Sequence, residues 1–262
     1  MKRLQALWRG ALLTAGAAAV CAGEGLLLLE TLRRGLAGLG SASARAAAPR
    51  FLAQTCNTLL LTGAALFVSI PLAAGAAAWL LRTRRRRMRR ALLRCLSALS
   101  GVPSAVYGLF GYLAFGSAIG LGYSLLTGAL TAALLTLPPA VFLIRGALLQ
   151  ADGSVFRSAL ALGASQERAV FGVQFAAARP GIESAAYLAA SRIAAESAAL
   201  LLTSGIGDAP PRGIVSQLFR SGATLTVGLY QSVLEGETAL AFSAGVLLML
   251  FVSLLQALAA GR

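Results

Sequence analysis

Long apolar stretches dominate the sequence, and polar residues gather in the shorter segments between them. Between Arg94 and Arg145 lie 50 residues without a charge. That is about twice what one membrane-spanning helix needs, since roughly 20 apolar residues cross the hydrocarbon core. Gly116, Gly120 and Gly122 mark a tight turn that divides this stretch into two helices. The pattern predicts an all-α, polytopic membrane protein.

Six transmembrane helices follow from the same pattern, and we expect them to form a single domain over residues 1–262. Pro71 is expected to kink the second helix, and Pro138 with Pro139 to break or bend the fourth. Residues 146–182 read as a long polar connection after the fourth helix. The predicted spans cover residues 10–30, 55–81, 95–115, 122–145, 184–206 and 238–260.

The first span could also be read as a cleaved signal peptide, because Lys2, Arg3 and Arg9 precede its apolar run. A lipoprotein cysteine would need a small residue directly before it. Cys21 instead follows Val20. An uncleaved first span is therefore the better interpretation.

Composition agrees with a membrane location. The 262 residues are 58% hydrophobic and 12% charged, with a mean hydropathy of +0.77, whereas a soluble domain carries about 25% charged residues. The net charge of +14 invites a nucleic-acid interpretation, but eight of the 23 basic residues lie between Arg82 and Arg94, beside a predicted span. Such segments stay in the cytoplasm and attract anionic lipid.

The distribution of basic residues sets the expected orientation. With the N-terminus inside, 16 of the 23 Lys and Arg residues fall in cytoplasmic segments and six in external ones, and Arg192 lies within the membrane. The positive-inside rule therefore places both termini of this multi-pass protein in the cytoplasm.

Several kinds of chemistry are excluded by what the sequence lacks. It has no histidine, and its three cysteines share no metal or redox spacing. No Ser/His/Asp set is available for an intramembrane hydrolase, so we expect a protein without catalytic residues or a metal site. The sequence also lacks G-x-x-x-x-G-K-[ST], so any ATP and magnesium must bind to a separate ATPase chain.

The predicted fifth span, residues 184–206, contains Arg192 and Glu196. A charge at such depth costs at least about 2.5–3.5 kcal/mol and usually faces a partner helix or a water-filled path. On one continuous helix the two side chains are four residues apart, and Thr203 lies on the same face. Two interpretations stay open. The pair forms a buried ion pair that fixes packing, or Arg192 is a transient site for an anion, moderated by Glu196.

The connection before this span predicts a helical elbow. A short apolar helix, 154–162, would end at Gly163, a natural position for a C-terminal cap. Ser165 can then cap a second helix with Glu167 in its first turn. On residue chemistry alone, docking into a soluble partner and an ordinary interfacial loop are equally good interpretations.

Four stretches make a family resemblance specific. The elbow, "SALALGAS…RPGI", resembles the cytoplasmic coupling loop of ABC importer permeases. "GVPSAVYGLFG" at 101–111, "LGYSLLTGALTAALLTLPP" at 121–139 and "SRIAAESAALLLTSG" at 191–205 resemble the A-type permease of the bacterial phosphate importer (PstA). The resemblance covers residues 55–205 well and the termini weakly, and it implies the MetI-like ABC importer permease fold.

The resemblance also implies residue roles, with some departures. The family's leading glutamate of the coupling motif falls on Arg157, and its Leu-Pro falls on Phe175 and Ala176. Its Gly, Thr and Pro in the fifth span are Ala195, Ser197 and Ala199 here. Arg192, Glu196 and Thr203 would line the substrate path. Contact with the ATPase would fall to Arg157, Ser158, Ala159, Gly163, Ala164, Ser165, Pro180 and Gly181.

The function implied by the resemblance is that of a transmembrane permease subunit of an ATP-driven importer of inorganic phosphate in the bacterial plasma (inner) membrane. Its implied partners are a second, PstC-like permease, a dimer of PstB-like ATPases, an external PstS-like phosphate-binding protein and membrane lipid. The nearest alternative is the same machine moving sulfate, molybdate or a phosphonate. A secondary carrier without an ATPase is a further alternative from another class.

Overall fold

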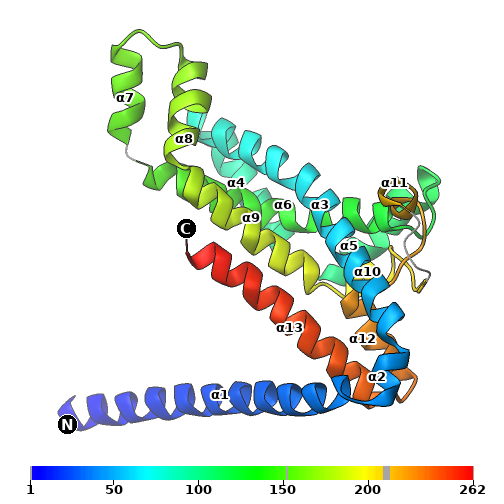
Figure 1. Cartoon of the computed structure of the whole chain (residues 1–262). Coiled ribbons are helices and arrows are strands. Elements are labelled where there is room, and N and C mark those ends of the chain that lie inside the picture. Colours follow the sequence, from blue (N-terminus) through cyan, green and yellow to red (C-terminus); the bar gives the residue numbers. More distant parts are fainter. Residues whose placement is uncertain (1, 152, 209–212, 262) are drawn as a thin grey trace.

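A computed structural model describes residues 2–151, 153–208 and 213–261, and these ranges contain helices and irregular segments but no strand (Figure 1). Two of the helical segments, η1 and η2, are π-helical. In chain order they are α1 (Lys2–Leu39), α2 (Ala42–Ala46), α3 (Ala48–Arg82), α4 (Arg86–Ser100), α5 (Ser104–Gly111), η1 (Tyr112–Ala118), α6 (Leu125–Gln150), α7 (Gly153–Ala161), η2 (Arg168–Gln174), α8 (Phe175–Ala177), α9 (Arg179–Ala194), α10 (Ala198–Leu201), α11 (Ile214–Leu218), α12 (Leu225–Leu234) and α13 (Thr238–Ala260).

Four of the described helices are long and apolar enough to cross a membrane. They are α1, over its residues Leu12–Leu39, together with α3, α6 and α13. They correspond to the predicted spans 10–30, 55–81, 122–145 and 238–260, although α1, α3 and α6 extend several residues beyond the predicted ends. The all-helical membrane class is confirmed.

The predicted span 95–115 is not one straight helix. α4 and the α5–η1 segment meet at 97°, and they count as a fifth span only if the bent pair is taken together. Pro103 lies at the bend, where it removes a backbone donor and disfavours helical geometry at the residue before it. The arginine-rich first half, α4, is thereby turned away from the direction of α5.

The predicted span 184–206 is also not continuous. α9 ends at Ala194, and a one-turn helix, α10, begins at Ala198. Two contacts stabilise the break. The carboxylate of Glu196 accepts a hydrogen bond from the amide of Ala199 (3.2 Å), and the hydroxyl of Thr226 donates to the carbonyl of Glu196 (2.7 Å). The second of these comes from α12, so local sequence does not reveal the break.

The two adjacent prolines of α6 do not interrupt it. The helix passes through Pro138 and Pro139 and continues to Gln150, so the expectation of a break there was wrong. The segment 146–182, expected as a polar connection, is mostly helical. It contains the end of α6, then α7, η2, α8 and the start of α9.

Small residues allow the central helices to pack closely. α3 lies mainly against α6, while α9 lies between α6 and α13. A helix face of alanine, serine and threonine lets two backbones approach in lipid, where close packing rather than water exclusion drives association. The buried residues of this kind on α3 include Thr58, Thr62, Ala65, Ser69, Ala73 and Ala77, and those on α6 include Ala129, Ala132, Ala133 and Ala140.

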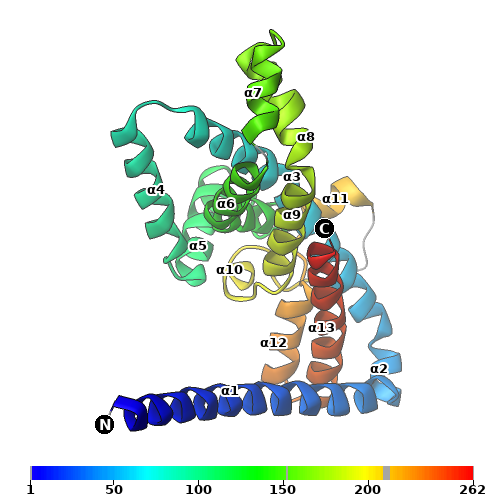
Figure 2. The same cartoon turned by 90° about the vertical axis from the view of Figure 1, so that its left-hand side faces the viewer.

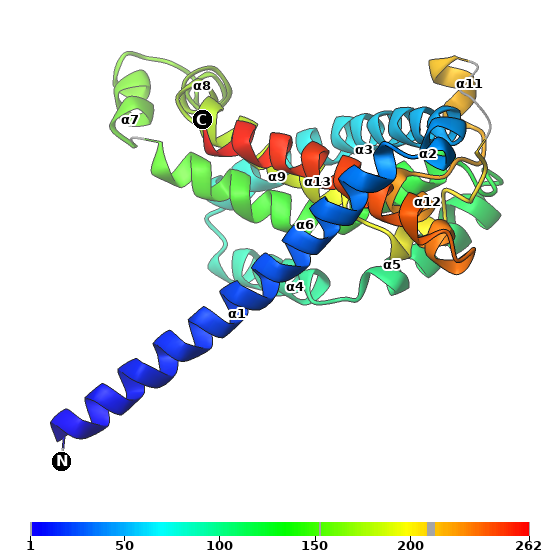
Figure 3. The same cartoon turned by 60° about the horizontal axis from the view of Figure 1, so that its bottom comes forward.

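α1 stands apart from the other helices. Only its C-terminal end meets the rest of the chain, against α13, and its N-terminal half projects away from the bundle (Figures 2 and 3). Gly35 and Gly38 are buried at this crossing. The two helices approach so closely that a Cβ on Gly35 would meet the backbone of Phe242, and one on Gly38 the backbone of Ala239. Within Leu12–Leu39 the most apolar window has none of its residues buried.

Candidate functional site

Arg192 lies in the last turn of α9, about 20 Å along the helix from Arg179 at a rise of 1.5 Å per residue. Its neighbours Ser191 and Ile193 are buried, whereas Arg192 is exposed, as is Leu188 one turn earlier. We call the side of α9 that carries Leu188 and Arg192 the open face. Arg192 forms no ion pair with any described carboxylate.

Glu196 does not pair with Arg192. It lies beyond the end of α9, where its carboxylate caps the amide of Ala199. The interpretation as a buried ion pair is therefore not what the structure contains. The prediction that both residues share one continuous helix was wrong, because α9 stops at Ala194.

Thr203 is placed away from the open face. It is fully buried in the turn after α10, and its hydroxyl donates to the carbonyl of Ala199 at 2.8 Å. Threonine hydroxyls bonded in this way satisfy their hydrogen-bonding needs within their own helix. Of the three predicted path residues, only Arg192 is exposed on the open face of the chain.

The predicted elbow is present as a pair of helical segments. α7 ends at Ala161, and Gly163 has a positive φ of +85°, the conformation that favours glycine after a helix. The hydroxyl of Ser165 accepts a hydrogen bond from the amide of Arg168 at 3.3 Å and so caps the next helical segment. The sequence prediction of a helix, a glycine turn and a capped second helix is confirmed.

The expected ATPase-contacting residues separate into two groups. Arg157, Ser158, Gly163 and Ser165 are exposed on the elbow, which extends beyond the ends of the bundle helices (Figure 1), and Ala159 and Ala164 are half-buried beside them. Pro180 and Gly181 instead lie in the first turn of α9.

The elbow is joined to α9 with little interruption. η2 leads into α8, and a single residue, Ala178, separates α8 from α9. At this point α9 touches α6 closely, since a Cβ on Gly181 would lie 2.6 Å from the Cβ of Ala147. A displacement of the elbow would therefore act directly on the helix that carries Arg192.

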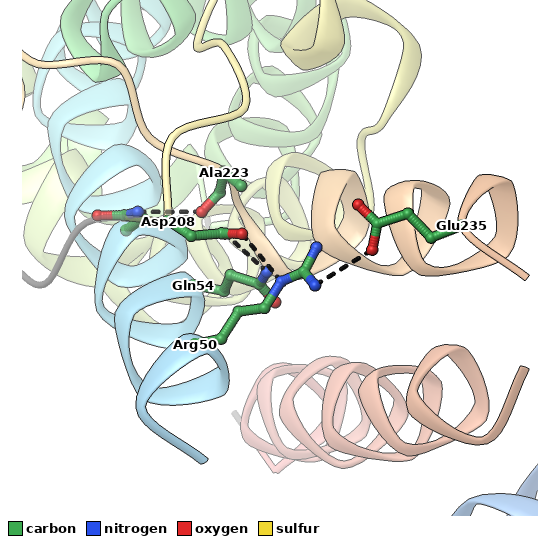
Figure 4. A network of polar contacts seen from close by, with 6 residues as sticks. Arg50, Gln54, Asp208, Ala223 and Glu235 are labelled. Carbon is green, nitrogen blue, oxygen red and sulfur yellow. Dashed lines mark hydrogen bonds and ion pairs between the residues drawn. The ribbon is translucent and has the colours of Figure 1, made fainter. Parts of the chain in front are cut away.

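A polar cluster at the N-terminal end of α3 was not predicted (Figure 4). The guanidinium of Arg50 lies 2.9 Å from the carboxylate of Asp208 and 3.3 Å from that of Glu235. The side-chain amide of Gln54 donates to the other Asp208 oxygen at 3.1 Å. These contacts join the start of α3 to the segment after α10 and to the end of α12.

One turn further along α3, Asn57 makes a second set of contacts. Its amide donates to the carbonyl of Ala223 at 3.0 Å, and its side-chain oxygen accepts from Gln217 at 2.9 Å. Asn57 and Gln217 are both buried. The partners in both sets are more than 150 residues apart in the chain, so no local sequence signal could have found them.

Two solved structures, both of ABC transporters, share this fold. One is an amino acid ABC transporter with histidines, with a TM-score of 0.54 and 18% identity over 84% of this chain and 97% of that chain. The other is a bacterial ABC transporter that imports the acidic polysaccharide alginate, with a TM-score of 0.55 and 12% identity over 93% and 98%. At these identities the likeness concerns the fold alone.

Residues 69–261 match the family model described as "Binding-protein-dependent transport system inner membrane component". This match covers more than half of the chain, and the protein belongs to that family. The matched region begins within α3 and includes the elbow, α9 and α13.

Curated relatives refine the resemblance toward phosphate permeases. The probable ABC transporter permease YqgI of Bacillus subtilis is 32% identical over 58% of this chain and 52% of its own length. PstA 2 of Mycobacterium bovis is 31% identical over 63% and 56%, and PstA of Xylella fastidiosa is 30% identical over 73% and 67%. The chain spans only about half the length of YqgI and of PstA 2. The predicted likeness to PstA-type permeases is confirmed.

Proposed function

We propose that this chain is a membrane subunit of an ATP-driven importer of inorganic phosphate, with Arg192 as a station on the translocation path. The observation that carries the proposal is an arginine on the open face of α9 that has no ion-pair partner among the described residues. Intramembrane arginines face protein or water rather than lipid. The relatives named as phosphate permeases supply the substrate class.

The open face implies a second permease chain. Because a guanidinium is costly to expose to lipid, another protein surface has to cover the side of α9 that carries Arg192. The apolar, uncovered length of α1 is available for the same kind of contact. We therefore propose that the path lies between this chain and a related, PstC-like permease, with phosphate supplied by an external PstS-like binding protein.

ATP hydrolysis is assigned to separate PstB-like subunits, which would hold the ATP and magnesium. The exposed elbow would dock on them, with the basic α4 on the same, cytoplasmic side of the plasma membrane and both termini inside. Closure of the ATPases would move the elbow, and the short link through Ala178 would transmit that movement to α9. Alternating access at Arg192 would follow.

In this mechanism Arg192 binds phosphate transiently. Its planar guanidinium can donate two parallel hydrogen bonds to an oxyanion. Glu196, four residues further on, is held by the amide of Ala199, so it adds negative charge near the path without neutralising Arg192. This arrangement would keep binding weak enough for release, as conduction requires.

The test is phosphate uptake by cells that depend on this transporter, with Arg192→Ala and Arg192→Lys compared. Loss of a charge-assisted hydrogen-bonding station, worth about 1.5–3 kcal/mol, predicts at least a tenfold fall in uptake for Arg192→Ala with the complex still assembled. Lysine keeps the charge and should recover part of it. Full uptake by Arg192→Ala would contradict the proposed role.

Two further measurements separate the alternative functions. Competition by sulfate, molybdate or a phosphonate against labelled phosphate identifies the preferred oxyanion. Transport by the purified chain alone under an ion gradient would instead identify an ATP-independent carrier, and it would overturn the assignment of an ATPase partner.

A further inference from the structure

A cavity of about 340 Å³ lies between the end of α3 and the elbow, and it plays no part in the proposed transport path. Its volume is at the lower end of the range for small-molecule sites. Polar residues line it both from the end of α3 with the segment after it and from the elbow, and apolar residues line it from α3, α7 and η2. The lining residues are Leu81, Arg82, Arg84, Phe156, Gln166, Val170 and Gln174.

The charge of the cavity is of one sign. Two guanidinium groups, those of Arg82 and Arg84, face no carboxylate among the described lining residues, and neither forms an ion pair with a described acidic side chain. Each guanidinium carries five N–H donors and no acceptor. Among the described residues, their one side-chain hydrogen bond is a long one, 3.4 Å, from the guanidinium of Arg82 to the side-chain oxygen of Gln166. Donors for an anion therefore remain.

The two sides of the cavity are fixed by different elements. Arg82 belongs to the last turn of α3, whereas Val170 and Gln174 lie one turn apart on the π-helix η2. The side-chain amide of Gln174 donates to the backbone carbonyl of Leu148 at 3.1 Å, which ties η2 to the end of α6. π-Helical segments are rare and occur frequently at functional sites. The cavity thus spans the joint between the bundle and the elbow.

We propose that this cavity binds a phosphate group, with Arg82 and Arg84 as the charged donors and Gln166 as a neutral donor from the elbow. Resting on the proposed function, the site would sense phosphate on the cytoplasmic side. A bound anion would link α3 to the elbow and restrain the movement that couples it to ATP hydrolysis. The same chemistry fits free inorganic phosphate and the headgroup of an anionic lipid.

The experiment measures equilibrium binding of labelled inorganic phosphate to the full chain in nanodiscs of phosphatidylcholine. The variant Arg82→Gln/Arg84→Gln removes both cavity charges. Arg86→Gln/Arg87→Gln removes two charges from the neighbouring start of α4, which does not line the cavity. We call these double variants the cavity pair and the control pair. Since hydrogen bonds to charged groups are strong, we expect phosphate to bind at least tenfold more weakly to the cavity pair, and less than about twofold more weakly to the control pair.

A second arm identifies the source of the phosphate group. In nanodiscs that contain phosphatidylglycerol, a lipid-occupied site would retain that lipid during purification and exclude free phosphate. If the cavity pair lost the bound phosphatidylglycerol and the control pair kept it, the result would support the site, with a lipid headgroup as its ligand. Equal phosphate binding and equal lipid retention in both pairs would overturn the proposal.

This outcome is distinguishable from failure of the transport assignment. The binding measurement needs neither an ATPase nor transport, so it can fail while phosphate uptake depends on Arg192. Arg192→Ala separates the two sites further, because it should leave binding at the cavity unchanged. Phosphate binding that vanished in Arg192→Ala and persisted in the cavity pair would belong to the translocation path and would overturn the cavity site.

Discussion

The position of α5 depends on Gly111, where the helix meets α6. A Cβ at this position would lie 2.6 Å from the Cγ2 of Thr131 and 2.8 Å from its Cβ. Carbon atoms in contact prefer about 3.5–4.0 Å. Thr131 is fully buried, and its hydroxyl donates to the carbonyl of Thr127 at 2.7 Å, so the side chain cannot turn away without losing that bond. Gly111→Ala should therefore force α5 away from α6.

The expected cost follows from this overlap. Inserting a methyl group into a packed core costs about 1–3 kcal/mol. For a chain of this length each kcal/mol shifts the unfolding midpoint by about 2–4 °C, so Gly111→Ala should lower it by about 2–12 °C. The assay is thermal unfolding of the purified full chain in detergent, followed by the fraction that remains monodisperse on size-exclusion chromatography.

Gly146→Ala is the matched control, because Gly146 lies in α6 and a Cβ there would have nothing within 4 Å. Its midpoint should stay the same or rise. Thr131→Ala removes both γ atoms that the new methyl group would meet, so the double variant Gly111→Ala/Thr131→Ala should recover part of the loss. If Gly111→Ala matched the control, or if the double variant lost the sum of both single effects, the close approach of α5 to α6 would be refuted.

Two further predictions concern the elbow and the buried amides. Gly163→Ala places a side chain at φ +85°, which costs about 1–2 kcal/mol although the site has free space. Less ATPase should then copurify with the variant. An unchanged yield of ATPase would argue against docking through this turn. Asn57→Ala leaves the side-chain amide of Gln217 and the carbonyl of Ala223 buried without their partner, and each unpaired group should cost about 1–3 kcal/mol of stability. The unfolding midpoint should therefore fall. A midpoint equal to that of the wild type would contradict these contacts.

Local sequence patterns were sufficient for the elbow. The apolar run before Gly163 and the hydroxyl of Ser165 act within a few residues of chain, and the structure has both the positive φ and the capping bond. Of the three glycines expected to mark the turn before α6, Gly120 and Gly122 have positive φ angles of +84° and +59°, whereas Gly116 lies within η1. Such features depend on backbone sterics and nearest neighbours, which a sequence displays directly.

Hydrophobic length was a weaker guide to helix continuity. The bend at Pro103 had a signal in the sequence, but an uncharged run of sufficient length concealed it. The end of α9 was not predicted, because one of the two contacts that stabilise the break comes from Thr226, 30 residues away. A run of apolar residues shows that a segment can lie in lipid, and it does not show whether one helix or two occupy it.

By itself the sequence determined the membrane class and most spans, because burial in lipid restricts composition along every helix. It also determined the elbow, which depends on local turn and capping residues. Only the tertiary structure decided that Arg192 is on the open face, that Glu196 caps Ala199 and that Arg82 shares a cavity with Gln166. These relations join segments that are distant in the chain or depend on where a helix stops. They follow from packing between helices, which no local pattern records.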